Sequence, residues 1–290
     1  MSYGTTDGLV QSVELEKQIR ELHKAVGNAV VDDKHVVFGT GSTQLINALV
    51  HALSPDADAA SPPASVVATV PYYAPYREQT TMFNGRKYKW DGDTAAWVNA
   101  SSQNSTHKSF IELVTSPNNP DTLLHVPVLN GSAAIVDRAY YWPHFTHFPG
   151  KPAADAGDRE GHAGQPPRRG GHLRLRLRSD EIQMSQAECR RVAVPSHLAA
   201  ENPSPVLHLL QANQRAVSST AYAWVKCGRE EDQNCYETLR KANIISRSGA
   251  VNEASSRYTR VSLLKSDDDF DVLLERLADL VNAEQYEASS

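Results

Sequence analysis

Residues 111–121 read IELVTSPNNPD, a short apolar run followed at once by a polar turn. The run is rich in β-branched residues and is bounded by proline and asparagine, which is typical of a strand. Residues 65–70 (SVVATV) and 133–137 (AAIVD) have the same character. Because all three runs are almost continuously apolar, they predict strands buried on both faces of a largely parallel sheet.

The segments before this sheet predict two helices. Residues 13–26 (VELEKQIRELHKAV) carry apolar side chains at helical spacing, and Gly27 ends the pattern. A short apolar run at 35–38 predicts a further strand, which is followed by the turn GTGSTQ at 39–44 and by a second helical pattern at 45–53. This part of the chain therefore reads as helix, strand, turn and helix.

The composition changes abruptly after Pro149. The segment that follows is rich in glycine, proline and arginine and lacks periodic apolar residues, so it predicts no packed core. Strand and helix patterns return in four places: 221–227, 235–242, 258–264 and 270–281. We therefore expect a large α/β domain at 1–149, an irregular segment at 150–219 and a small α+β domain at 220–290.

The bulk properties exclude several classes of protein. The chain has 29 Lys plus Arg against 34 Asp plus Glu, a formal charge of -5, which gives no reason to expect a nucleic-acid partner. Cys189, Cys227 and Cys235 are too few for a disulfide framework, and no Cys/His set has the spacing of a metal site. No apolar run approaches the roughly 20 residues that span a membrane. We expect no membrane contact, a reducing compartment and a cytoplasmic location.

The turn before the second helix suits a phosphate. It offers backbone N–H groups, two hydroxyl side chains and the positive end of a helix dipole. Its members are Thr40, Gly41, Ser42, Thr43 and Gln44. The alternative is an ordinary capped turn in which Ser42 or Thr43 is the N-cap.

Two further polar features follow predicted strands, where open α/β sheets bind ligands. Asn119 stands in the turn after the strand at 111–115, and Asp137 and Tyr140 stand at the end of the strand at 133–137. A carboxylate there can pair with a protonated ring nitrogen, and a tyrosine can donate to a ring oxygen. The alternatives are a simple Asn-Pro turn and a capping aspartate.

In this order the three features resemble one family. The segments VVFGTGSTQL, VPYYAPYREQT, YKWDGD, IELVTSPNNPD, DRAYYWPHFT, AYAWVKC and SRYTRVSLLK are similar to those of the plant alliinase and tryptophan aminotransferase-related family. The resemblance covers residues 10–149 and 220–282. It implies the fold of pyridoxal-phosphate-dependent aminotransferases, with a mainly parallel sheet in a large domain and a small C-terminal α+β domain.

The resemblance also implies a role for each matched residue. Residues 40–44 cradle the phosphate of pyridoxal 5'-phosphate, Tyr73 stacks on its ring, and Asn119 with Tyr140 bonds its phenolic oxygen. Asp137 keeps the ring nitrogen protonated, which makes the ring a better electron sink.

The matched position for the substrate carboxylate is Arg260, whose planar guanidinium suits a bidentate pairing. A surface arginine on a strand is the alternative for this residue. The same resemblance implies an amino-acid or 2-oxo-acid substrate and a homodimer. The amino-terminal section of this chain is shorter than the family's, which counts against the dimer.

The resemblance fails at the catalytic lysine. The family's Ser-Lys-x-Thr-Gly-His-Ala-Gly-Ser-Arg segment survives only as Gly-His-Ala-Gly at 161–164, and the position of the Schiff-base lysine holds Asp158. Gln165 and Pro166 replace the Ser-Arg pair. A one-base shift of the codons for 164–167 can encode Gly-Ser-Arg-Leu, so we hypothesise that residues from about 150 to about 216 derive partly from a shifted frame. The transcript tests this.

These observations leave several functions open. The preferred one is amino transfer from an aromatic L-amino acid, with the activity of this chain impaired by the missing lysine. Carbon–sulfur lysis of an S-alkyl cysteine sulfoxide and a non-catalytic cofactor-binding role are the alternatives. Nucleic-acid binding through the arginines at 168–178 is disfavoured by the net acidity and by the absence of interleaved aromatic residues.

Overall fold

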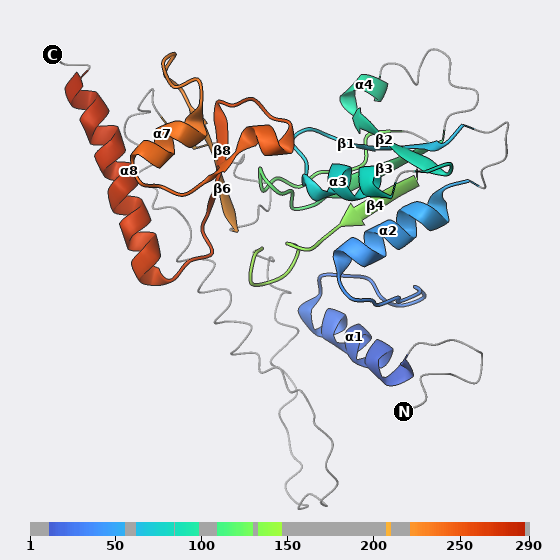
Figure 1. Cartoon of the computed structure of the whole chain (residues 1–290). Coiled ribbons are helices and arrows are strands. Elements are labelled where there is room, and N and C mark those ends of the chain that lie inside the picture. Colours follow the sequence, from blue (N-terminus) through green and yellow to red (C-terminus); the bar gives the residue numbers. More distant parts are fainter. Residues whose placement is uncertain are drawn as a thin grey trace, which may run out of the picture.

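The computed structural model describes residues 12–55, 62–83, 85–98, 109–129, 133–146, 207–209 and 221–287. Its strands form two four-stranded sheets, ordered β2-β1-β3-β4 and β5-β6-β8-β7, which lie side by side in Figure 1. The described residues do not include Asp158, the segment at 161–166, the arginines at 168–178 or Cys189. What the sequence predicts for these residues therefore remains a prediction.

The first sheet is parallel throughout, as the sequence predicts. Its strands are β1 (Ala64–Ala68), β2 (Tyr88–Asp93), β3 (Phe110–Thr115) and β4 (Ala133–Asp137). Every residue of β1 is buried, whereas β4 lies at the sheet edge and alternates between buried and exposed positions. Burial on both faces therefore holds for the inner strands and fails at the edge.

Helices accompany this sheet, and the second, third and fourth of them contact its strands. They are α1 (Val13–Val26), α2 (Ser42–Leu53), α3 (Pro75–Met82) and α4 (Ala95–Val98). The predicted bounds of α1 are confirmed, with Ser12 capping its start and Gly27 in the left-handed conformation at its end. From α2, Ile46 and Val50 enter the core that holds Ile111 of β3.

The predicted strand at 35–38 is wrong. The structure assigns no strand to these described residues, and Val37 is 69% exposed. A four-residue apolar run becomes a strand only when a neighbouring strand pairs with its backbone. In the parallel sheet, residues 35–38 pair with neither of the edge strands, β2 and β4.

The second sheet is antiparallel and carries the C-terminal helices. Its strands are β5 (Leu207–Leu209), β6 (Tyr222–Cys227), β7 (Arg247–Ser248) and β8 (Tyr258–Ser262), and the helical elements are α7 (Cys235–Lys241), η1 (Gly249–Asn252) and α8 (Asp267–Glu287). Leu273, Leu277 and Leu280 of α8 pack against the core of β6 and β8. The short β5 falls inside the segment that the sequence predicts to be irregular.

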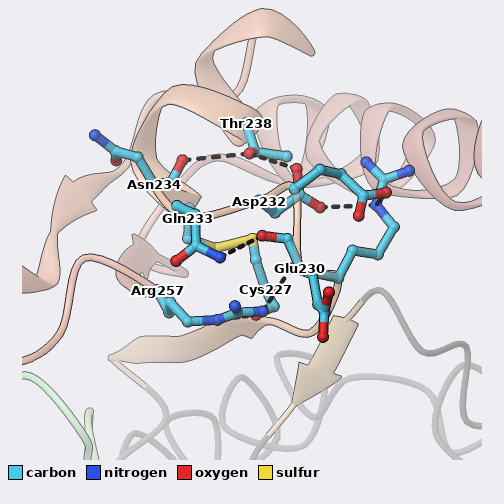
Figure 2. Close-up of polar contacts among 10 residues, drawn as sticks. Cys227, Glu230, Asp232, Gln233, Asn234, Thr238 and Arg257 are labelled. Carbon is cyan, nitrogen blue, oxygen red and sulfur yellow. Dashed lines mark hydrogen bonds and ion pairs between the residues drawn. A yellow bond between two sulfur atoms is a disulfide. The ribbon is translucent and has the colours of Figure 1, made fainter.

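A disulfide joins Cys227 at the end of β6 to Cys235 at the start of α7, with Cα atoms 5.4 Å apart. The sequence predicts no disulfide framework and a reducing compartment, and this single bridge does not fit the second expectation. The spacing gave no disulfide framework, but the fold brings the strand end and the helix start together. Figure 2 shows the polar contacts that fix the enclosed loop, in which Arg257 donates to the carbonyl of Cys227 and Asp232 accepts from Thr238.

Two of the contacts between the parallel and the antiparallel parts are made by residues in or next to η1. Arg77 of α3 pairs with Glu253 at 2.8 Å, and the buried amide of Asn252 donates to the carbonyl of Tyr72 at 2.7 Å. Asn252 is the last residue of η1 and Glu253 follows it. The segment after β7 is therefore anchored on the loop that follows β1 and on α3. Within the described part of the chain, no helix is long and apolar enough to cross a membrane, and no His/Cys/Asp/Glu cluster is placed to hold a metal ion.

Candidate functional site

The candidate site lies where the parallel strands end and β6 begins. The turns after β1, β3 and β4 carry Tyr73, Asn119 and Tyr140, while Tyr222 and Arg260 come from the antiparallel sheet. The carboxyl ends of parallel strands meet at one sheet edge, which is why residues from these separate segments converge there.

Asp137 ends β4 and is held by two donors. The hydroxyl of Tyr76 lies 2.9 Å from its Oδ2 and 2.7 Å from the hydroxyl of Thr115, and the backbone N–H of Ala139 donates to its Oδ1 at 2.9 Å. Burial, and then the nearby charge of Asp137, raises the pKa of Tyr76 well above its usual range, so its proton is retained. The carboxylate is thus fixed in direction before any ligand arrives.

Asn119 and Tyr140 meet as the sequence predicts. The Asn119 amide nitrogen lies 3.4 Å from the Tyr140 hydroxyl. That hydroxyl also lies 2.7 Å from the hydroxyl of Tyr222, and the two rings meet edge to face with centroids 5.4 Å apart. Burial raises the pKa of Tyr140 above its usual range.

Arg260 reaches the same cluster from β8. Its Nη1 donates to the Asn119 side-chain oxygen at 2.7 Å, and its Cζ lies 4.1 Å from the centre of the Tyr222 ring. Its Nε is buried and has no hydrogen-bond partner among the described residues. Desolvation lowers the pKa of Arg260 from its usual value, but an arginine remains charged at neutral pH.

Tyr73 lies close to this group. Its ring meets the Tyr76 ring at 87°, with centroids 5.4 Å apart. Tyr73 is thereby in contact with the residue whose hydroxyl holds Asp137.

The turn at 39–44 leads directly into α2. Helix α2 begins after Gly41, whose φ of 117° and ψ of 168° suit glycine, and no side chain caps its first N–H groups. The predicted alternative, Ser42 or Thr43 as N-cap, is therefore wrong. Gln44 instead accepts from the backbone N–H of Thr40 at 2.7 Å. The contacts described do not join residues 40–44 directly to Asn119 or Asp137, although α2 packs against β4 and α3.

The sequence reasoning missed Tyr76, Thr115 and Tyr222. Thr115 sits at the strand end that the pattern marked, and Tyr76 lies one helical turn beyond Tyr73 in the matched segment VPYYAPYREQT. Tyr222 stands in AYAWVKC, two residues before the residue that pairs with Arg260. Strand alternation puts Tyr222 on the same face of the sheet as Arg260. The sequence shows the alternation, but only the pairing of β6 with β8 shows that the two residues are neighbours.

Comparison with known proteins gives consistent matches. The family described as Allinase matches residues 1–162 and 208–281. The chain is 35% identical over 329 residues to alliin lyase 1 of Allium sativum, covering 94% of this chain and 67% of that protein. It is 36% identical over 335 residues to tryptophan aminotransferase-related protein 4 of Arabidopsis thaliana, covering 98% and 72%.

Solved structures show the same fold. An aspartate aminotransferase from Rhizobium meliloti superposes with a TM-score of 0.59 at 16% identity, covering 93% of this chain and 82% of that one. N-succinyldiaminopimelate aminotransferase from Mycobacterium tuberculosis gives a TM-score of 0.60 at 16% identity, covering 92% and 83%. At these identities the likeness establishes the architecture, which is the predicted α/β fold.

Proposed function

The chain belongs to the alliinase family, and from this premise we propose that its site binds pyridoxal 5'-phosphate together with an amino-acid or 2-oxo-acid substrate. The observation that carries the proposal is the convergence of Asn119, Tyr140 and Arg260, in which the Asn119 side chain is hydrogen-bonded to both of the others. Two features fit such ligands: the buried Nε of Arg260 has no partner among the described residues, and no side chain caps the start of α2.

Each residue has a part in this proposal. The first N–H groups of α2 and the hydroxyls of Thr40, Ser42 and Thr43 bind the phosphate. Asp137, oriented by Tyr76, would accept a hydrogen bond from the protonated ring nitrogen and so keep the proton on that nitrogen.

When bound, the cofactor withdraws electrons from the α-carbon of the substrate. Tyr73 covers the ring, and Asn119 and Tyr140 donate to its phenolic oxygen. Arg260 binds the substrate carboxylate through Nε and Nη2, because Nη1 is already donated to Asn119. These contacts orient the substrate and exclude water from its carboxylate.

The proposed reaction of this site is amino transfer from an aromatic L-amino acid. The tryptophan aminotransferase-related relatives support it. The second candidate is β-elimination from an S-alkyl cysteine sulfoxide, which the alliin lyases among the relatives favour. With Asp158 at the lysine position we expect this chain to bind its ligands and to turn them over far more slowly than a lysine-bearing relative, because a carboxylate cannot act as the amine nucleophile.

The test is cofactor binding to the full chain. We expect calorimetric titration with pyridoxal 5'-phosphate to give one site per chain, dialysis to remove the cofactor, and borohydride treatment to leave residue 158 unmodified in the peptide mass map. Assays with L-tryptophan plus pyruvate, and separately with S-allyl cysteine sulfoxide, rank the two reactions. Failure of the chain to bind the cofactor at micromolar concentration overturns the proposal.

The cytoplasmic location remains a prediction, and the Cys227–Cys235 disulfide counts against it. Disulfides persist in oxidising compartments and are rare in the cytosol. Trapping free thiols with a mass label in extracts of the source tissue separates the two cases: the cytoplasmic location requires that Cys227 and Cys235 be labelled without prior reduction.

The homodimer is likewise a proposal. Among the described residues, Val13 of α1 (66%) and Leu49 and Leu53 of α2 (46% and 44%) are exposed apolar side chains that a second copy can cover. Light scattering after size exclusion measures the mass, and a monomer at high micromolar concentration contradicts a dimer.

A further inference from the structure

Strand pairing places Tyr222 beside the arginine of the site. In the antiparallel register of β6 and β8, Arg260 lies opposite Trp224. Tyr222 is two residues from Trp224 and therefore on the same face of the sheet. Diagonal neighbours of this kind are within reach of aromatic and long side chains. The Arg260 Cζ accordingly lies 4.1 Å from the centre of the Tyr222 ring.

This contact fixes the plane of the guanidinium. One face of Arg260 rests on the ring of Tyr222, and Nη1 donates to Asn119 at 2.7 Å. The two constraints leave Nε and Nη2 as the edge that a carboxylate can meet, and Nε is buried without a partner among the described residues. A guanidinium whose plane is set in advance loses less conformational freedom when it binds a carboxylate.

The hydroxyl of Tyr222 acts on a different neighbour. It lies 2.7 Å from the hydroxyl of Tyr140, and either oxygen can be the donor. The Asn119 amide donates to Tyr140 from 3.4 Å. If Tyr222 also donates, Tyr140 accepts from both neighbours and its own proton is free to point at a further oxygen. If Tyr140 donates to Tyr222 instead, that proton is used inside the protein.

We propose that Tyr222 is a positioning residue that serves two ligands at once: its ring holds Arg260 for the substrate carboxylate, and its hydroxyl donates to Tyr140 so that the Tyr140 proton faces the phenolic oxygen of the cofactor. The proposal rests on the proposed function of the site. It assigns a role to a residue that comes from the antiparallel sheet, whereas Asp137 comes from the parallel one.

Two substitutions separate the ring from the hydroxyl. Tyr222→Phe keeps the ring under Arg260 and removes the hydroxyl; Tyr222→Leu removes both. The probes are pyridoxal 5'-phosphate and, on the cofactor-loaded chain, indole-3-propionate, a carboxylate without an amino group. Its amide is the matched control ligand. Binding is measured by calorimetry, and circular dichroism and thermal melting check the fold of each variant.

For Tyr222→Phe we expect about fivefold weaker cofactor binding and an unchanged affinity for indole-3-propionate. For Tyr222→Leu we expect the cofactor loss to persist and the affinity for indole-3-propionate to fall about tenfold, with the amide unaffected. The double variant Tyr140→Phe/Tyr222→Phe should lose no more cofactor affinity than Tyr140→Phe alone, because the two hydroxyls act through one contact.

Three results overturn the proposal. In the first, both variants bind both probes as the unsubstituted chain does. In the second, both variants lose both probes equally together with a lower melting temperature, which marks a purely structural role. In either case binding of the cofactor by the unsubstituted chain leaves the proposed function standing. In the third, the unsubstituted chain binds no cofactor, and the proposed function fails as well.

Discussion

At the level of single residues, Asp137 is held in place by donors from two segments. Tyr76 donates to one oxygen and the Ala139 N–H to the other, so the carboxylate pays little orientational entropy when it pairs with a ring N–H. We expect Asp137→Asn to weaken binding of pyridoxal 5'-phosphate by tenfold to a hundredfold, since a charged hydrogen bond contributes about 1.5–3 kcal/mol. Calorimetric titration measures the change.

The matched control is Asp32→Asn. Asp32 pairs with Lys24 at 2.6 Å, its side chain is 72% exposed, and none of the described contacts joins it to Asp137, Asn119 or Tyr140. Its substitution should leave cofactor affinity within twofold. Equal affinities for the Asp137 and Asp32 variants would show that Asp137 is not a cofactor residue.

The buried hydroxyl of Tyr76 should make the free energy of unfolding depend on pH in the alkaline range. Burial raises its pKa above the usual value of 10.0, so above pH 10 the unfolded chain loses this proton while the folded chain keeps it. The stability is fully present below pH 10 and is lost as the pH rises. The free energy of unfolding should fall by about 1.4 kcal/mol per pH unit for this group. Urea unfolding at pH 9 to 11 (roughly one unit on either side of the ordinary value) measures the slope.

Tyr76→Phe is the control for that slope. It keeps the ring and removes the titrating hydroxyl, so the alkaline slope should shrink by one proton. The variant should also be less stable near neutral pH, by about 1–2 kcal/mol, because the bonds to Thr115 and Asp137 are gone. An unchanged alkaline slope would place the Tyr76 pKa in its ordinary range.

At the level of elements, β3 carries a buried carboxylate with a structural task. Glu112 is 1% exposed and accepts the N–H groups of Val128 and Leu129 at 3.0–3.1 Å. These bonds fasten the segment that follows the Asn119 turn to the sheet. Glu112→Leu should lower the free energy of unfolding by about 1–3 kcal/mol, because both backbone donors lose this acceptor.

Glu112→Gln is the milder comparison, because it keeps one acceptor oxygen and nearly the same volume. We expect it to cost less than the leucine variant in urea unfolding. If the two variants are equally stable, the hydrogen bonds to 128–129 contribute nothing measurable and the segment is held by other contacts.

The disulfide acts on the element that joins β6 to α7. A disulfide that closes so short a loop restricts the unfolded chain and adds about 2.5 kcal/mol to the free energy of unfolding. The double variant Cys227→Ala/Cys235→Ala should therefore unfold at lower urea concentration. Cofactor affinity should stay within twofold, because Cys227 lies at the far end of β6 from Tyr222, about 17 Å along the strand. Loss of cofactor binding in a folded variant would contradict this separation.

At the level of the whole molecule, the candidate site draws on both sheets. Asn119 and Tyr140 come from the parallel part and Arg260 from the antiparallel part, and Figure 1 shows the two sheets adjoining. Ligands that bind between them should stabilise both parts together. At a hundred times its dissociation constant, each ligand adds about 2.7 kcal/mol to the free energy of unfolding.

Calorimetric melting of the chain with pyridoxal 5'-phosphate and indole-3-propionate tests this coupling. We expect one transition that moves upward with both ligands. Arg260→Gln should keep the shift due to the cofactor and lose the shift due to the carboxylate. Two separate transitions, of which the ligands move only one, would show that the site belongs to one part of the chain.

The sequence alone determined the elements whose patterns are long or strongly apolar. The α1 helix follows from its spacing and its terminating glycine, although none of its residues is buried. The inner strands β1 and β3 follow from their β-branched composition, because strands buried on both faces carry apolar side chains at nearly every position. The polar turns after β3 and β4 were visible for the same reason, since ligands bind where such strands end.

Only the tertiary structure decided the rest. It left the 35–38 run outside the sheet, paired Cys227 with Cys235, and brought Tyr76 to Asp137 and Tyr222 to Arg260. None of these partners is marked by local spacing, because each contact joins segments that meet only after the sheets have formed. Residues 35–38 show that a local pattern alone is not enough. Their composition predicts a strand, but no neighbouring strand pairs with their backbone N–H and C=O groups.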